Sequence, residues 1–372
     1  MAIVSLWRGL SPLLAAALLT GAPLSEAAVK KKHPHMKSAT SVKSTARSAS
    51  ARSGPTYGQR EDVRQFADEV AARRGLDAQW TRRTLAQAHQ VPVVARLILP
   101  PQRGVSKNWA AYRARFVEPT RIQAGVAFWQ ANRETLARAE QEFGVPAEIV
   151  VGILGVETLY GRDMGTFKEL DALATLAFDF PAAHPRADER REFFKGELEQ
   201  YLSLAFRSGI AADSVRGSYA GAMGMPQFMP SSWNRYAIDY DGDGKVDLFT
   251  SPADAIGSVA NYFKSFGWQN GLPTHYPVSF DTARLDKETL LLPDILPTFN
   301  PERFAALGAQ VQADAAAPPK GPLALIELQN GSDEPSYVAG TENFYVITRY
   351  NWSSYYAMAV IHLGREIAKA MR

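Results

Sequence analysis

The spacing of apolar residues divides the chain into a helical body and a shorter segment of mixed character. Apolar positions recur every three to four residues, as on one face of an α-helix, in four stretches of the front half: 63–72, 80–89, 109–116 and 122–143. From residue 277 to about 348 the pattern changes to short β-like runs, 324–328 and 345–348, around a Pro- and Ala-rich stretch. A final amphipathic helix is predicted over 354–370. The pattern therefore predicts a mainly α protein with one small, partly β insertion.

One predicted helix carries an acid on its most apolar face. Pro146 suits a first helical turn and Gly161 a helix end, so a helix of about four turns is expected between them. The residues three, four, seven and eight positions before Glu157 are all apolar: Leu154, Ile153, Val150 and Ile149. A carboxyl group buried on such a face has a raised pKa, so it holds a proton near neutral pH, as a general acid must. The alternative is that Glu157 emerges from the core at the helix end and pairs with Arg162.

A glycine-rich loop, GSYAGAMGMPQFMPSSW, occupies residues 217–233. No Lys-Ser or Lys-Thr follows its glycines, which excludes a phosphate-binding loop of the usual form. Its neutral hydrogen-bonding side chains, Ser218 and Gln227, stand among aromatic and methionine side chains. That mixture suits a sugar, which has an apolar ring face and a rim of hydroxyl groups. The other interpretation is a tight, methionine-packed turn that only supports the fold.

Acidic residues after this loop have the spacing of an EF-hand-like calcium site. Three aspartates stand at loop positions 1, 3 and 5, and the carbonyl of the residue at position 7 completes the pattern. Thr250 occupies position 12, where a bidentate Glu is usual, so a later aspartate is the natural substitute in a longer loop. That aspartate could equally be the first-turn acid of a helix capped by Ser251. The predicted ligands of a structural calcium ion are Asp239, Asp241, Asp243, Lys245 and Asp254.

Composition and charge exclude several other classes of protein. The 372-residue chain has no cysteine, which removes disulfide frameworks, thiol nucleophiles and the lipid-bearing cysteine of a lipoprotein. The six histidines are scattered without HExxH spacing, so a zinc site is not expected. The net charge of +3 combines a basic segment, residues 28–56 with seven cations and no acid, with a body of net charge −4. That body has no basic stripe with interleaved aromatic residues, so we expect no binding of nucleic acid.

The first residues of the chain predict export. Arg8 precedes an apolar run at 13–19 and small residues up to Ala27, which is typical of a cleaved signal peptide over residues 1–27 and too short to span a bilayer. We therefore expect a periplasmic protein without a lipid anchor. Residues 28–56 have almost no large apolar side chain and predict a disordered basic linker. Its charge could hold the protein near an anionic surface or serve only as a solubilising tether.

Taken together, these segments resemble the lytic murein transglycosylase B family, glycoside hydrolase family 103, in its soluble periplasmic form. The likeness runs from about residue 60 to the C-terminus, and the linked set of motifs is highly specific. The matching segments are GVETLYGRDMG at 155–165, LDALATLAFDFP at 170–181, FFKGELEQYL at 193–202, the glycine-rich loop at 217–233, DYDGDGKVDLF at 239–249, DAIGSVANYF at 254–263 and RYNWSSYYAMAV at 349–360.

The resemblance implies a mainly α (α+β) fold with a lysozyme-like helical core. The expected parts are a helical accessory lobe at 57–140, the catalytic core with the EF-hand-like loop at 141–276, a small partly β lobe at 277–346 and a C-terminal segment at 347–372 that packs on the core. It also implies a monomer that acts on peptidoglycan glycan strands and needs no organic cofactor.

The resemblance further implies a lytic transglycosylase with one catalytic acid and base, Glu157 of the ETxYG segment. This residue would protonate the glycosidic oxygen between N-acetylmuramic acid and N-acetylglucosamine. It would then take the proton of the muramoyl C6 hydroxyl, which closes a 1,6-anhydro ring without water. A second carboxylate is unnecessary, since no water is activated, and the substrate's own N-acetyl group could replace it.

Other roles follow from the resemblance only where the local motif matches. Family members present two adjacent arginines to the peptide stem, whereas here Glu189 stands beside Arg190 at that place. The calcium loop also has one extra residue before its last aspartate. The implied substrate-binding residues are Tyr112, Arg190, Ser218, Gln227, Tyr262, Tyr350, Asn351 and Tyr356.

Two other functions remain open at this point. The first is a lysozyme-type muramidase, which hydrolyses the same bond with water. The second is a cell-wall binding module that has the calcium-ordered loop but no catalytic activity.

Overall fold

The computed structural model describes residues 54–100, 107–312 and 319–372. The fold is mainly α with small antiparallel sheets, so the mainly α (α+β) prediction is confirmed. The predicted signal peptide and residues 28–53 of the predicted linker lie outside the described residues. Residues 54–56 belong to the folded body, since the backbone N–H of Gly54 donates to the carbonyl of Gln90 at 2.7 Å. The predicted disordered linker therefore extends three residues too far.

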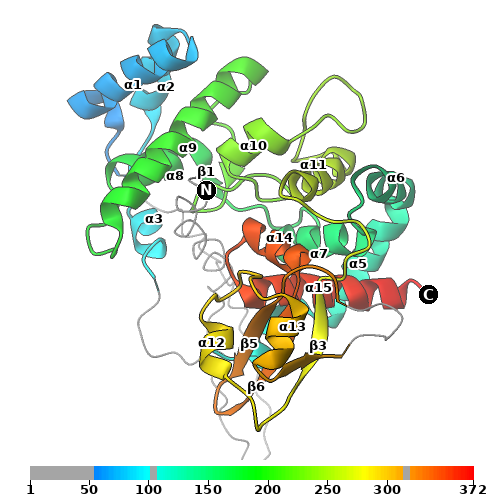
Figure 1. Cartoon of the computed structure of the whole chain (residues 1–372). Helices are drawn as coiled ribbons and strands as arrows, with labels where there is room; N and C mark the ends of the chain where they lie inside the picture. Colours follow the sequence, from blue (N-terminus) through cyan, green and yellow to red (C-terminus); the bar gives the residue numbers. More distant parts are fainter. Residues whose placement is uncertain (1–53, 101–106, 313–318) are drawn as a thin grey trace, which may run out of the picture.

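The helices of the front segment, residues 57–143, form two groups (Figure 1). The first group packs against the pair α8 and α9, and the second packs against the central helices α7, α11 and α15. The predicted helix over 122–143 is two helices, because Asn132 between them is not helical. The first group is the 3-10 turn η2 (Tyr57–Gln59), α1 (Glu61–Arg74), α2 (Ala78–Gln87) and α3 (Pro92–Leu97). The second group is α4 (Trp109–Phe116), α5 (Pro119–Ala131) and α6 (Arg133–Phe143).

The middle of the molecule is built on α7 and the C-terminal helix α15, which cross in close contact (Figure 1). Glycines make this contact possible: a Cβ on Gly152 would collide with the carbonyl of Val360, and one on Gly364 with the carbonyl of Glu148. Nearly every residue of α7 is buried. The central elements are α7 (Ala147–Thr158), β1 (Phe167–Lys168), α8 (Glu169–Phe178), α9 (Ala187–Ser208), β2 (Arg216–Gly217), α10 (Pro230–Tyr236), α11 (Pro252–Ser265) and α15 (Ser354–Ala370).

A four-stranded antiparallel sheet forms the small lobe, with the strand order β4-β3-β6-β5. It lies across the molecule from α1 and α2 (Figure 1) and has its own apolar core, which includes Leu290, Phe304 and Leu325. The elements are β3 (His275–Phe280), α12 (Lys287–Leu291), α13 (Pro301–Ala306), β4 (Ala309–Val311), β5 (Ala324–Asn330) and β6 (Asp333–Gly340).

One predicted strand of this lobe is wrong. Residues 345–348 lie in helix α14 (Glu342–Tyr350). Their β-branched and aromatic side chains favour a strand by intrinsic propensity. The helix forms because the Thr341 side chain caps it, accepting from the N–H of Asn343, and because one face buries Phe344 and Ile347 in the core.

None of the helices in the described ranges is long and apolar enough to cross a membrane.

The domain limits drawn from the sequence stay a prediction. Helices α1–α3 and α4–α6 of the predicted accessory lobe contact different central helices.

Candidate active site

Glu157 is the next-to-last residue of α7 and is 8% exposed. The helix ends directly after it in a sharp turn, where Leu159 and Tyr160 both have left-handed φ angles, 50° and 59°. Such angles are unfavourable for these side chains and are kept only where surrounding contacts impose them. The Thr158 hydroxyl supplies one such contact, since it donates to the carbonyl of Met225 at 2.8 Å. The turn therefore fixes the acid against the glycine-rich loop.

The Glu157 carboxyl group has few hydrogen-bonding neighbours. Its Oε1 accepts a short hydrogen bond from the hydroxyl of Tyr356. Burial raises the pKa of Glu157 to about 7, although the bond from Tyr356 acts in the opposite direction. Arg162 is exposed, and no ion pair joins it to Glu157 in the described part of the chain. The carboxyl is thus placed to hold a proton near neutral pH, as the helical pattern predicts.

Three of the predicted tyrosines form a continuous cluster beside this acid. The rings of Tyr356 and Tyr350 stack with centroids 6.5 Å apart, and Tyr350 contacts Tyr262 at 4.9 Å. The Tyr262 hydroxyl donates to the carbonyl of Arg349 at 2.7 Å, and that of Tyr350 donates to the carbonyl of Pro226. The three tyrosines come from α11, α14 and α15, so the cluster joins three separate elements.

Tyr112 on α4 approaches the acid from another side. Burial, and after it the negative charge of Glu157, raise the pKa of the Tyr112 hydroxyl. The Tyr112 ring packs edge-on against Tyr355 with centroids 5.8 Å apart. The structure therefore brings Tyr112, Tyr350 and Tyr356 close to Glu157, and their contact with a glycan stays a prediction.

Ser218 and Gln227 are both buried, and their side chains hold the glycine-rich loop in shape. Ser218 Oγ accepts from the backbone N–H of Ala222 at 3.1 Å. Gln227 Nε2 donates to the carbonyl of Gly224 at 3.0 Å and to that of Met164 at 3.3 Å. Gln227 also helps to line a cavity, called the aromatic cavity below, whose wall holds six aromatic side chains beside polar and charged ones: Phe193, Phe228, Tyr236, Tyr262, Phe266 and Tyr350.

The last two predicted substrate-binding residues differ in their surroundings. Asn351 follows α14 and is 1% exposed, and its Oδ1 has no hydrogen-bond partner among the described residues. Arg190 lies near the start of α9 and is also buried. Burial, and then the charge of Arg186, lower the pKa of Arg190 to about 10. Stem binding by Arg190 stays a prediction.

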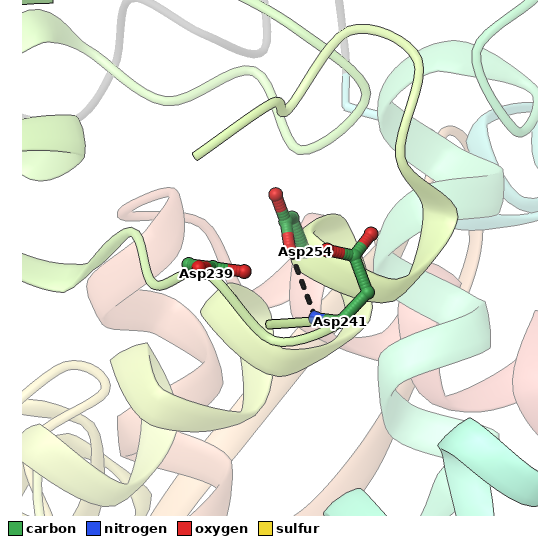
Figure 2. Close-up of side chains that lie close together, drawn as sticks. All are labelled: Asp239, Asp241 and Asp254. Atoms are coloured by element: carbon green, nitrogen blue, oxygen red, sulfur yellow. Dashed lines mark hydrogen bonds between the residues drawn. The ribbon is translucent and has the colours of Figure 1, made fainter. Parts of the chain in front are cut away.

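The predicted calcium loop brings three carboxylates together (Figure 2). Oxygen atoms of Asp239, Asp241 and Asp254 lie within 4.8 Å of one another. Asp254 reaches the loop from the first turn of α11, where Ser251 caps the helix. Asp243 is not part of this group and accepts from the N–H of Lys245 at 2.8 Å. Asp254 is therefore a first-turn acid of α11 that also lies beside the loop aspartates, and its binding of calcium stays a prediction.

Sequence reasoning missed two buried acids near the glycine-rich loop. Glu197 on α9 lines the aromatic cavity, and its carboxylate accepts from the backbone N–H of Ser231 at 2.9 Å and from its hydroxyl at 2.7 Å. Glu169, the first residue of α8, is completely buried. Both residues belong to motifs of the family resemblance or border them, but no local pattern distinguishes them from acids on a helix surface.

Comparisons with known proteins show the family of this chain. A family model described as "Transglycosylase SLT domain" matches residues 58–365. Membrane-bound lytic murein transglycosylase B of Escherichia coli K12 is 39% identical over 326 residues, which cover 85% of each chain.

Solved structures are similar to this chain over most of its length. Catenated lytic transglycosylase SltB1 from Pseudomonas aeruginosa matches with a TM-score of 0.76 and 40% identity, covering 85% of this chain and 100% of its own. Escherichia coli lytic transglycosylase Slt35 in complex with calcium matches with a TM-score of 0.72 and 39% identity, covering 86% and 97%. The resemblance inferred from the motifs is therefore confirmed, and the chain belongs to the family of lytic transglycosylases that share the transglycosylase SLT domain.

Proposed function

We propose that this enzyme cleaves the β-1,4 bond between N-acetylmuramic acid and N-acetylglucosamine in peptidoglycan and leaves 1,6-anhydromuramoyl products. The observation that carries the proposal is the buried Glu157, whose pKa is raised to about 7. At that pKa the carboxyl group can release and recover a proton near neutral pH with little cost in either direction. A reaction that needs one group first as acid and then as base requires this balance.

Glu157 would act twice within one turnover. Its carboxylic acid gives a proton to the glycosidic oxygen as the bond to the muramoyl C1 breaks. The carboxylate left behind then takes the proton of the C6 hydroxyl, whose oxygen bonds to C1. Atoms balance without water, and the enzyme returns to its protonated form. The hydroxyl of Tyr356 supports the first step, since its hydrogen bond favours the ionised form that remains after the proton is given.

The neighbouring side chains suit the sugars of this substrate. The Tyr350 and Tyr262 rings offer flat apolar surfaces against which a pyranose ring can pack, and Gln227 adds a polar group in the same wall. The Oδ1 of Asn351, which has no hydrogen-bond partner among the described residues, can accept a hydrogen bond from the N–H of an acetamido group. We assign the same glycan cleft to Tyr112 and Ser218, and contact with the peptide stem to Arg190.

A muramidase is the competing function with the same bond specificity. Hydrolysis would need a second carboxylate to activate water or to stabilise the reacting sugar. Glu197 lines the adjoining cavity, but both of its oxygens accept hydrogen bonds from Ser231. That arrangement favours a structural role for Glu197 and a single-acid mechanism.

Product analysis tests this proposal. Purified peptidoglycan is digested with the wild-type enzyme, and the masses of the soluble fragments are measured by mass spectrometry. We expect anhydromuropeptides. Products heavier by one water would replace the proposal with a muramidase, and an absence of soluble fragments at high enzyme concentration would favour the non-catalytic binding module.

We also propose a structural calcium ion in the loop at 239–254. The donor set fits a hard cation, since the clustered atoms are carboxylate oxygens and three such groups repel one another without a counter-ion. The ion would be held by Asp239, Asp241 and Asp254, with Asp243 and the carbonyl of Lys245 as the remaining ligands of an EF-hand-like loop. It would order this loop and take no part in the reaction.

Melting curves test the calcium site. We expect millimolar Ca²⁺ to raise the Tm of the wild-type protein by several degrees. The variant with Asp239→Ala and Asp241→Ala should lose this rise, whereas Asp333→Ala, at an exposed aspartate of the small lobe, should keep it. A rise of equal size in all three proteins would show that calcium acts elsewhere.

We further propose that the enzyme works in the periplasm as a monomer. The support is the exported character of residues 1–27 and the location of peptidoglycan, which requires a glycan hydrolase or lyase outside the cytoplasm. Fractionation of cells that express the full chain, followed by sedimentation of the purified protein, tests both statements.

A further inference from the structure

A second buried acid lies beneath the glycine-rich loop. Glu169 begins α8 and has an exposed fraction of 0%. Neither of its carboxyl oxygens has a hydrogen-bond partner in the described part of the chain. Burying a polar group without partners is unfavourable, so a carboxyl at this position calls for an explanation.

The carboxyl group lies directly against the loop. A Cβ built on Gly217 would lie 2.5 Å from Oε2 of Glu169, and one built on Gly221 would lie 3.1 Å from Oε1. These two glycines bracket Ser218. The Ser218 N–H donates to the carbonyl of Ala222 at 2.9 Å, and the Ala222 N–H donates back to Ser218 Oγ at 3.1 Å. The acid therefore contacts both ends of the short turn that sets the position of the Ser218 hydroxyl.

We propose that Glu169 is a positioning residue that supports the glycine-rich loop from beneath and so places Ser218 for contact with the glycan. This inference rests on the sugar-binding role proposed above for Ser218. Glu169 itself lies under the loop and touches no substrate. Its backbone N–H donates to the carbonyl of Val215 at 3.0 Å, and β1 immediately before it pairs with β2, so its own place is fixed from both sides of the loop.

The carboxyl group performs this role in its uncharged form. Burial, and after it the charge of Glu197, raise the pKa of Glu169 well above its usual value. Further ionisable groups of the same region are Tyr201 on α9, Asp171 on α8 and Asp213 before β2. The cations of the paired strands, Lys168 and Arg216, form no hydrogen bond with the Glu169 carboxyl group among the described residues. The first turn of α8 would favour a negative charge, but only by a fraction of the cost of burying an unpaired carboxylate.

Kinetics of paired variants provide the first test. Because Glu169→Ala leaves a void under the loop, we expect it to lower kcat/KM about tenfold in the wild type but less than twofold in a Ser218→Ala background. Glu169→Gln keeps the shape without a charge and should stay within about twofold of the wild type at pH 6–7. Equal losses from Glu169→Ala in both backgrounds would overturn the proposal.

A second test needs no activity, so it separates this inference from the proposed function. We expect Glu169→Ala to accelerate amide hydrogen exchange at Ala222 at least about tenfold. The matched control is Thr175→Ala, in the same helix as Glu169. It removes the buried hydrogen bond that the N–H of Val91 donates to the Thr175 hydroxyl, and it should leave Ala222 protected. If Ala222 exchanged equally fast in both variants, Glu169 would contribute only to general stability, and the proposed positioning of the loop would be contradicted.

The protonation state has its own readout. If Glu169 is uncharged in the folded protein, it ionises only in the unfolded chain as the pH rises above about 4.5. The free energy of unfolding of the wild type then falls with rising pH. The Tm difference between Glu169→Gln and the wild type should therefore grow between pH 5 and pH 8. A constant difference would show that the carboxyl is ionised in the folded enzyme and would contradict the proposed support of the loop.

Discussion

Two buried carboxyl groups in this molecule have opposite surroundings. Glu157 accepts one hydrogen bond, from the hydroxyl of Tyr356. Asp254 accepts from the backbone N–H groups of Tyr240 and Asp247, each at 2.7 Å, and from that of Asp241 at 3.4 Å. Burial raises the pKa of both residues, and hydrogen bonds oppose the rise in both.

The difference lies in what each hydrogen-bonding partner does. Backbone amides are fixed by the chain, so the carboxylate of Asp254 ties the acidic loop to the first turn of α11 and contributes to folding. The single hydroxyl at Glu157 leaves the carboxyl group short of partners, which keeps its two protonation states close in free energy. The supply of fixed donors therefore distinguishes Asp254, an acid that ties a loop to a helix, from Glu157, the proposed catalytic acid, and each prediction below tests that distinction.

The largest expected effect is on activity at Glu157. Glu157→Gln keeps the size of the side chain but removes the group that we propose gives and takes the proton, so we expect kcat to fall about 10³-fold. Release of soluble fragments from peptidoglycan measures it. The matched control is Glu148→Gln, at an acid in the first turn of the same helix, which should stay within twofold. Equal activity of Glu157→Gln and the wild type would end the assignment of the acid.

The next effect is on stability at Asp254. Asp254→Ala leaves two or three backbone N–H groups without acceptors, so we expect the free energy of unfolding to fall by about 3 kcal/mol, measured by urea denaturation in the presence of EDTA. Asp243→Ala, at an exposed aspartate outside the carboxylate cluster, should cost less than about 1 kcal/mol under the same conditions. If the two variants lost equal stability, the backbone bonds to Asp254 would have no special weight.

A smaller effect of opposite sign is expected for stability at Glu157. The pKa of Glu157 is raised in the folded protein, so below pH 4.5 the acid does not lower the free energy of unfolding. The destabilisation grows as the pH rises to about 7. Glu157→Gln should therefore be more stable than the wild type by about 2 kcal/mol at pH 7 and by nearly nothing at pH 4. Denaturation curves at both pH values measure it, and a variant less stable at pH 7 would contradict the raised pKa.

The sequence predicted these features to different extents. Helical spacing placed Glu157 in line with the apolar residues of its helix but left open whether it emerges from the core, and the family resemblance then favoured the buried acid. The same reasoning failed at 345–348, where β-propensity is overruled by a cap and a buried helical face. It also missed Glu169, since an acid at a helix start normally faces solvent, and only the tertiary fold lays the glycine-rich loop over it.

The smallest expected effect concerns the hydroxyl of Tyr356. Its hydrogen bond favours the ionised form of Glu157, so Tyr356→Phe should raise the pKa of that acid above 7, by roughly one pH unit. In the proposed mechanism activity requires protonated Glu157, so we expect it to fall as the pH rises through this pKa. The alkaline limb of the kcat/KM profile should therefore move upward in the variant, even though the loss of a cleft hydroxyl lowers the maximum.

The neighbouring stacked ring supplies the matched control for Tyr356. Tyr350→Phe removes a hydroxyl that donates to the carbonyl of Pro226 and makes no bond to Glu157. It should lower the maximum of kcat/KM while leaving the alkaline limb near pH 7. A shift of equal size in both variants would mean that the tyrosines act on Glu157 through burial alone. A shift confined to Tyr356→Phe would show that one hydrogen bond sets how far the pKa of the acid lies from the value that burial alone would give.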